Sequence, residues 1–225
     1  MNPAVLTGIL LILVPLAFNI TFILLQRTFE YPDILRQPTE AILRRFKQGG
    51  APLRRLWYGF AFSAVLFTPV PVLVQQVFGD NAPWFLSTGT FIGVLAGVVQ
   101  FLGLIRWPFL VPSLADIYTD PASSQASRDS AAVTFQAFHR YVGVGVGEHL
   151  GYLFTSAWSV LVCIAILETG IVHPLFGWLG ILPAAGVWMG VFEETGFKPA
   201  GAINAISYLL WSAWLIALGV AVLLM

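Results

Sequence analysis

Six long stretches of apolar residues alternate with shorter polar segments along the chain. They lie at about 4–26, 56–78, 84–105, 141–167, 171–192 and 203–224. Each is long enough to cross a hydrocarbon core of about 30 Å, which takes about 20 helical residues. Only helices and closed barrels satisfy their backbone hydrogen bonds in lipid, and these runs lack the alternation of barrel strands. The pattern predicts an all-α polytopic transmembrane bundle of six helices, and we expect residues 1–225 to form a single domain.

Composition agrees with a membrane location. Hydrophobic residues make up 58 % of the 225 residues and charged residues only 10 %, and the mean hydropathy is +0.83. Such a chain cannot cover its surface with polar groups, so it belongs in a bilayer. A single cysteine, Cys163, excludes an intramolecular disulfide and a thiolate metal site. Nucleotide-binding, metalloprotease and serine-hydrolase motifs are absent from the sequence, so an enzyme is not favoured.

The positive charges are segregated along the chain. All eleven Lys and Arg residues lie on or beside the segments that follow the first, third and fifth apolar stretches. Because cytoplasmic loops carry the positive excess, this pattern places those segments in the cytoplasm. We therefore expect both termini on the non-cytoplasmic side, and we expect no nucleic-acid partner.

The first polar segment, TFEYPDILRQPTEAILRRFKQGGAPLRR, contains a predicted short helix at 39–48. It ends at a pair of glycines that can adopt positive φ. Ile42, Leu43 and Phe46 share one side, as an interfacial helix on lipid requires. The basic residues of the other side would contact anionic lipid: Arg44, Arg45 and Lys47. A solvated helix without a lipid role is the alternative.

The second polar segment runs from Trp107 to Arg140. Pro108 and Pro112 predict the end of the third span. Asp120 followed by Pro121 predicts the start of a cytoplasmic helix that runs without a break into the fourth span.

Glycines recur at every fourth position on the third and fourth spans. Small residues at this spacing let helices approach closely in lipid, so we expect a packing role. The residues are Gly89, Gly93 and Gly97 on the third span, and Gly143, Gly147 and Gly151 on the fourth.

Two ionisable side chains, Glu148 and His149, interrupt the apolar run YVGVGVGEHLGYLF at 141–154. A carboxylate at membrane depth costs about 2.5–3.5 kcal/mol, so Glu148 should face protein or water. Helical periodicity places Glu148 on one face with Tyr141 and Tyr152. Arg106, at the inner end of the third span, lies at a suitable depth to pair with it.

Three interpretations of this pair stay open. In the first, Glu148 and His149 lie at the inner membrane interface and brace the fourth span through polar contacts. A ligand or ion site would comprise Glu148, His149, Arg106, His139, Arg140 and Tyr152. Haem or metal ligation is the third, but His139 and His149 are ten residues apart, about 15 Å on a helix, and cannot share a metal. We therefore assign no metal site, and the sequence identifies no cofactor.

The segments RWPFLVPSLADIYTDP, HRYVGVGVGEHLGYLF and NAISYLLWSAWLIALG resemble bacterial multi-pass membrane proteins grouped as a family of unknown function. The resemblance covers the chain from the third span onward. It implies a location in the bacterial inner membrane and nothing about activity.

Together these features predict a non-enzymatic membrane protein, acting as an accessory subunit or as a bundle that binds a small molecule or lipid in its cytoplasmic half. A proton- or ion-coupled transporter that uses Glu148 is one alternative. A cofactor- or pigment-bearing redox subunit is another. Membrane lipids are the expected partners, and a protein partner or a second copy of the chain is left open.

Overall fold

The computed structural model describes residues 2–225, which fold into helices joined by short connections, without a β-strand in that range. Six helical segments are long and apolar enough to cross a membrane: Pro3–Phe29, Thr39–Asn81, Trp84–Thr119, Gln125–Thr169, Leu175–Thr195 and Ala200–Leu223. The predicted all-α bundle of six spans is confirmed, and the chain has the build of a multi-pass membrane protein.

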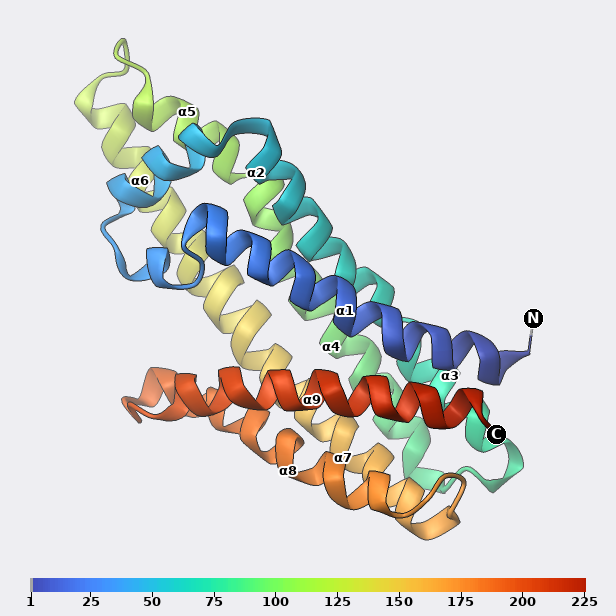
Figure 1. Cartoon of the computed structure of the whole chain (residues 1–225). Helices are drawn as coiled ribbons and strands as arrows, with labels where there is room; N and C mark the ends of the chain where they lie inside the picture. The colour runs from blue at the N-terminus through green and yellow to red at the C-terminus, as the bar shows by residue number, and fades with distance from the viewer. Residues whose placement is uncertain (1) are drawn as a thin grey trace.

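Prolines and changes of helix type divide these segments into shorter elements (Figure 1). The α-helices are α1 (Pro3–Phe29), α2 (Thr39–Phe67), α3 (Val70–Phe78), α4 (Trp84–Phe109), α5 (Val111–Thr119), α6 (Gln125–Phe138), α7 (Gly151–Thr169), α8 (Leu175–Met189) and α9 (Ala200–Leu223). Three short 3-10 helices are η1 (Asp33–Arg36), η2 (Gly79–Asn81) and η4 (Gly190–Thr195). A π-helix, η3 (His139–Leu150), joins α6 to α7.

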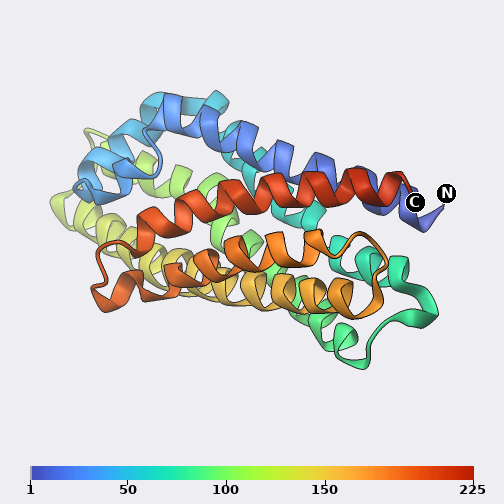
Figure 2. The same cartoon turned by 60° about the horizontal axis from the view of Figure 1, so that its bottom comes forward.

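The two ends of the bundle differ. Both termini lie side by side at one end, which we call the terminal end, and there α1 and α9 pack closely (Figures 1 and 2). A β-carbon on Gly8 would lie only 2.8 Å from the Gly219 carbonyl oxygen. Toward the opposite end the two helices diverge. That end carries η1, α5, α6 and η4 and is called the basic end, because it holds most of the Arg and Lys residues.

A buried aromatic cluster closes the basic end on the side of α2 and α4. Its members are Phe29, Phe46, Trp57, Trp107 and Phe135. The Trp57 and Trp107 rings stack with centroids 4.3 Å apart, and Phe29 meets both rings edge-on. Offset-stacked and edge-to-face contacts of this kind stabilise beyond the area they bury. The cluster therefore holds α1, α2 and α4 together at the basic end.

The predicted helix at 39–48 forms the first arm of α2. Gly50, with φ 55° and ψ −147°, turns the chain from this arm into the span, as only glycine does without strain. The expectation that its apolar side lies on lipid is wrong, because Ile42, Leu43 and Phe46 are buried in a cluster with residues of α1, α4, α5 and α6. Its basic side chains form exposed ion pairs: Arg44 with Glu40, Arg45 with Glu30, and Lys47 with Asp116. Their contact with anionic lipid stays a prediction.

The second polar segment departs from its prediction in two places. Helix α4 ends at Phe109, between Pro108 and Pro112, but the helical path does not stop there, because α5 begins at Val111. Asp120 ends α5 instead of starting α6. The cap of α6 is Ser124, whose hydroxyl accepts a hydrogen bond from the Ser127 N–H at 3.2 Å. The predicted unbroken path into the fourth span is confirmed, since Gln125–Thr169 is continuous.

The glycines of the third and fourth spans lie against neighbouring helices. A β-carbon on Gly93 would meet Pro71 and Trp158, and one on Gly151 would meet Gln100. Of these glycines Gly147 lies closest to another backbone, because its added β-carbon would be 2.8 Å from the Cα of Gly103. The backbones of α4 and η3 therefore touch here. The remaining ladder glycines also face side chains of other elements: Gly89 faces Leu161, Gly97 faces Thr68, and Gly143 faces Arg106.

The Gly147→Ala variant tests this contact. It should unfold at a lower temperature than the wild type, because the new methyl group meets backbone and overpacking costs about 1–3 kcal/mol. Gly145→Ala is the matched control on the same helix, where an added β-carbon finds only the Arg140 carbonyl oxygen at 3.6 Å. Alanine's higher helix propensity should leave that variant as stable as the wild type or more so. Thermal unfolding in detergent measures both, and equal midpoints for the two variants would contradict the contact.

Candidate functional site

A cavity of about 700 Å³ lies at the basic end of the bundle. Residues of α1, α4, η3 and α9 line it. The ends of α1 and α9 diverge at this end of the bundle (Figures 1 and 2). Segments far apart in the sequence line it, including η1 near the start of the chain and η4 near its end. The cavity is therefore a product of the tertiary fold.

The structure brings all six predicted site residues to this one cavity. Arg106 comes from α4, and Tyr152 comes from the first turn of α7. The other four come from the π-helix: His139, Arg140, Glu148 and His149. That they bind a ligand or an ion stays a prediction.

Arg106 is the most buried charge of the site, with 7 % of its surface exposed. Its Nη1 donates to the Gly103 carbonyl oxygen, its Nη2 lies 3.3 Å from His139 Nδ1, and its Nε has no partner. The guanidinium also lies 5.3 Å from the centre of the Trp107 ring, within the range of a cation–π contact. Gly143 makes room for this arrangement, because a β-carbon there would collide with the guanidinium.

The expected ion pair between Arg106 and Glu148 does not form. Within residues 2–225 no carboxylate lies within 4.0 Å of the Arg106 guanidinium. The Gly103 carbonyl oxygen and His139 each occupy one N–H group of the guanidinium. Arg106 is therefore a buried cation held by neutral groups.

His139 is one of those neutral groups. Its ring stacks on Phe135, with centroids 5.8 Å apart and planes 13° apart. Because a guanidinium has only donors, Nδ1 of His139 must accept, and the ring proton then lies on Nε2. His139 therefore orients Arg106 without neutralising it.

The π-helix determines which side chains accompany Glu148. In a π-helix the hydrogen bonds run from i to i+5, so each turn holds more residues than an α-turn. Tyr141, predicted to share the face of Glu148, is consequently 74 % exposed and does not line the cavity. Tyr152 does line it. The Glu148 side chain, half-buried, forms no ion pair with any residue in the described range 2–225.

Sequence reasoning missed several residues of the cavity wall, among them Tyr31, Tyr208 and Glu193. A signal for Tyr208 was present, since YLLWSAW at 208–214 echoes YLFTSAW at 152–158. Tyr152 and Tyr208 both line the cavity, and their ring centroids lie 5.8 Å apart. Tyr31 lies between the first two spans, and its burial raises the pKa of the phenol, so its hydroxyl remains a hydrogen-bond donor.

Charged residues also lie at the mouth of the cavity. Arg140 and Glu194, both well exposed, form an ion pair at 3.4 Å between η3 and η4. Exposed pairs of this kind contribute about 0–1 kcal/mol. This ion pair therefore adds little to the stability of the contact between η3 and η4.

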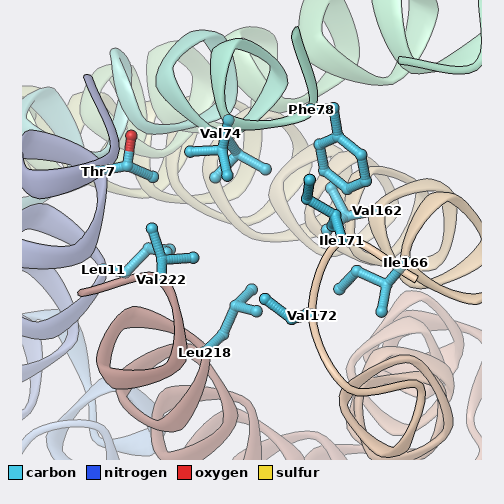
Figure 3. Close-up of a pocket in the computed structure, with 11 residues that line it drawn as sticks. Thr7, Leu11, Val74, Phe78, Val162, Ile166, Ile171, Val172, Leu218 and Val222 are labelled. Carbon is cyan, nitrogen blue, oxygen red and sulfur yellow. The ribbon is translucent and has the colours of Figure 1, made fainter. Parts of the chain in front are cut away.

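A second, much smaller cavity of about 10 Å³ lies at the terminal end (Figure 3). Its walls are aliphatic or aromatic, apart from Thr7. The Thr7 hydroxyl lies 2.7 Å from the Pro3 carbonyl oxygen and 3.2 Å from that of Leu73, so it is already satisfied. This gap is a packing defect with room for about one water.

A family model described as "Domain of unknown function (DUF4386)" matches residues 6–219. The chain belongs to this family. The matched range of DUF4386 includes every residue named above as lining the large cavity, so the cavity is a feature of the family domain in this chain. No curated protein and no solved structure matches the chain.

The DUF4386 cavity offers a ligand charged groups, phenols and aromatic faces. In the part of the chain that the structure describes, no three His, Cys, Asp or Glu side chains converge to hold a metal ion. The groups present instead suit an organic molecule that has both polar and apolar parts.

Proposed function

We propose that this protein binds a small amphiphilic molecule in the cavity at its basic end. The observation that carries the proposal is the cavity itself, about 700 Å³ in volume and lined by a buried arginine that lacks a counter-ion. Ligand sites are typically concave, mostly apolar and about 300–1,000 Å³ in volume, with a few polar groups that orient the ligand.

The apolar part of the wall supports an amphiphile over a wholly polar ligand. Phe18, Phe22 and Phe60 form one side, with the Phe18 and Phe60 centroids 4.8 Å apart. On the facing helix α9, Leu209 lines the cavity and is also exposed on the outer surface of the bundle. In a membrane this outer surface meets lipid, so we expect an acyl chain to enter the cavity beside Leu209.

The proposed setting is the bacterial inner membrane, with the basic end in the cytoplasm and the terminal end outside. Its support is the positive charge at the basic end, since Lys and Arg accumulate in cytoplasmic loops. In this orientation the cavity lies in the cytoplasmic leaflet.

Cysteine labelling tests this orientation. In a Cys163→Ser background, which removes the buried native thiol, an Asn81→Cys variant places a thiol on η2, and an Ala122→Cys variant places one between α5 and α6. In intact cells a membrane-impermeant maleimide should label the first variant only, and after permeabilisation it should label both. The reverse order of labelling would contradict the orientation.

Native mass spectrometry of the protein released from its own membrane in mild detergent tests the binding proposal. We expect a bound small molecule on the wild type and its loss in the Val144→Trp variant, because the indole fills the cavity that Val144 lines. Val133→Trp, at an exposed position of α6, should keep the molecule. A bare wild-type chain would contradict the proposal. A co-released protein would support the accessory subunit, and visible absorption would support the pigment or redox subunit.

A proton-coupled transporter is the second candidate, and the position of Glu148 favours it. Glu148 lines a cavity at the basic end, whereas Phe67, Trp158 and Trp211 fill the bundle beyond it. The Phe67 centroid lies 5.3 Å from that of Trp158 and 5.7 Å from that of Trp211. A titratable group in a cavity that reaches only one side is what an inward-facing carrier requires.

Transport predicts that Glu148→Gln abolishes proton uptake coupled to the copurified molecule, since the glutamine cannot titrate. Proteoliposomes loaded with a pH-sensitive dye measure that uptake. Glu168→Gln, at the opposite end of the same helical path, is exposed and should behave as the wild type. Flux at the wild-type level in Glu148→Gln would reject the transporter.

A further inference from the structure

The charged groups of the cavity fall into two classes. Some are paired near the mouth: Arg140 with Glu194, and Arg36 with Asp33. Others line the cavity without an ion-pair partner in the range 2–225: the buried Arg106, the half-buried Glu148, and Glu193, which is exposed to solvent and so needs no counter-ion. The unpaired groups therefore include both a cation and a carboxylate, so a matching ligand would carry both a negative and a positive charge.

Arg106 calls for an anionic group. It is more than nine-tenths buried, its Nε has no hydrogen-bond partner, and its other contacts are to neutral groups. A buried charge without a partner is costly, and an incoming phosphate or carboxylate would offset that cost with charge-assisted hydrogen bonds. An arginine suits such oxyanions because its N–H groups form a planar fork.

Glu148 calls for a cationic group close to that anion. It lies five residues after Gly143, the residue that contacts the Arg106 guanidinium, and five residues make about one turn of a π-helix. Arg106 reaches η3 from α4, so its guanidinium lies against the turn of η3 next to the one that carries Glu148. Tyr152 and Tyr208 line the same region, and their ring faces attract a ligand cation.

We propose that the cavity binds a zwitterionic head group, with its phosphate or carboxylate at Arg106 and its ammonium at Glu148. This inference rests on the proposed function, in which the cavity holds an amphiphile. An anion alone would leave Glu148 uncompensated beside a second negative charge, and a cation alone would leave Arg106 buried without a partner. A phosphoethanolamine lipid and a free small zwitterion share this chemistry.

Lipid binding to the delipidated protein in detergent tests the head group. Three lipids with the same acyl chains are compared by native mass spectrometry: phosphatidylethanolamine, which is zwitterionic, phosphatidylglycerol, which is only anionic, and diacylglycerol, which is uncharged. We expect phosphatidylethanolamine to bind at least tenfold more tightly than either of the others. Competition by glycerophosphoethanolamine, which has no acyl chains, distinguishes the sources, because strong competition means a free zwitterion and weak competition means a lipid.

Two variants assign the charges to residues. Glu148→Gln should remove the preference for phosphatidylethanolamine over phosphatidylglycerol, whereas the matched control Glu168→Gln should keep it. Arg106→Gln should lower the affinity for both phospholipids at least tenfold toward that for diacylglycerol. If Arg106→Gln does not fold, the three-lipid comparison on the wild type and on Glu148→Gln still tests whether the cavity prefers a zwitterionic head group.

The outcomes separate this inference from the proposed function. If all three lipids bind equally and Val144→Trp blocks them, the cavity binds amphiphiles and the zwitterion inference is wrong. Tighter binding of phosphatidylglycerol than of phosphatidylethanolamine would also overturn the inference alone. If no lipid and no free zwitterion binds the wild type, both fail together.

Discussion

The backbones of α4 and η3 touch at Gly103 and Gly147, and the arrangement of the cavity depends on this contact. In lipid, helices gain little from hydrophobic burial against one another, so close packing through small residues holds them together. The contact brings Gly143 against the Arg106 guanidinium and presents His139 to it. A larger residue at Gly103 or Gly147 would separate the two helices and so remove the hydrogen bond that orients the arginine.

The π-helical form of η3 is the second condition for this site. A π-helix still satisfies its backbone hydrogen bonds internally, so it is compatible with a membrane. Its wider turn places Glu148 and Tyr152 on the cavity wall and turns Tyr141 outward. Short π-helical insertions are frequent at functional sites, and here twelve consecutive residues adopt this form. The π-helical form of η3 thus decides which of its side chains face the cavity.

Features that depend on local sequence were predicted well. The spans follow from long apolar runs, and the turn at Gly50 follows from the freedom of glycine at positive φ. Features that depend on tertiary contacts were not. Phe46 has the pattern of a lipid-facing residue, but it is buried against Phe29 of α1 and Trp107 of α4. All six predicted site residues line one cavity, and their binding role stays a prediction. The predicted partner of Arg106 is wrong, because an α-helical register does not reveal a π-helix.

The difference between the two ends of the bundle explains why the large cavity opens at the basic end and not at the terminal end. At the terminal end, Gly8 and Gly219 let α1 and α9 meet at backbone distance, and the space left there is about 10 Å³ (Figure 3). At the basic end, the aromatic cluster ties α1 to α2 and α4, while the first turns of α9 follow η4 and pack with α8 and η4. The two helices must therefore diverge, and a cavity open at this end is the geometric consequence. Any ligand it holds reaches Arg106 and Glu148 from the basic end or from the adjoining lipid, because packed aromatic side chains fill the rest of the path.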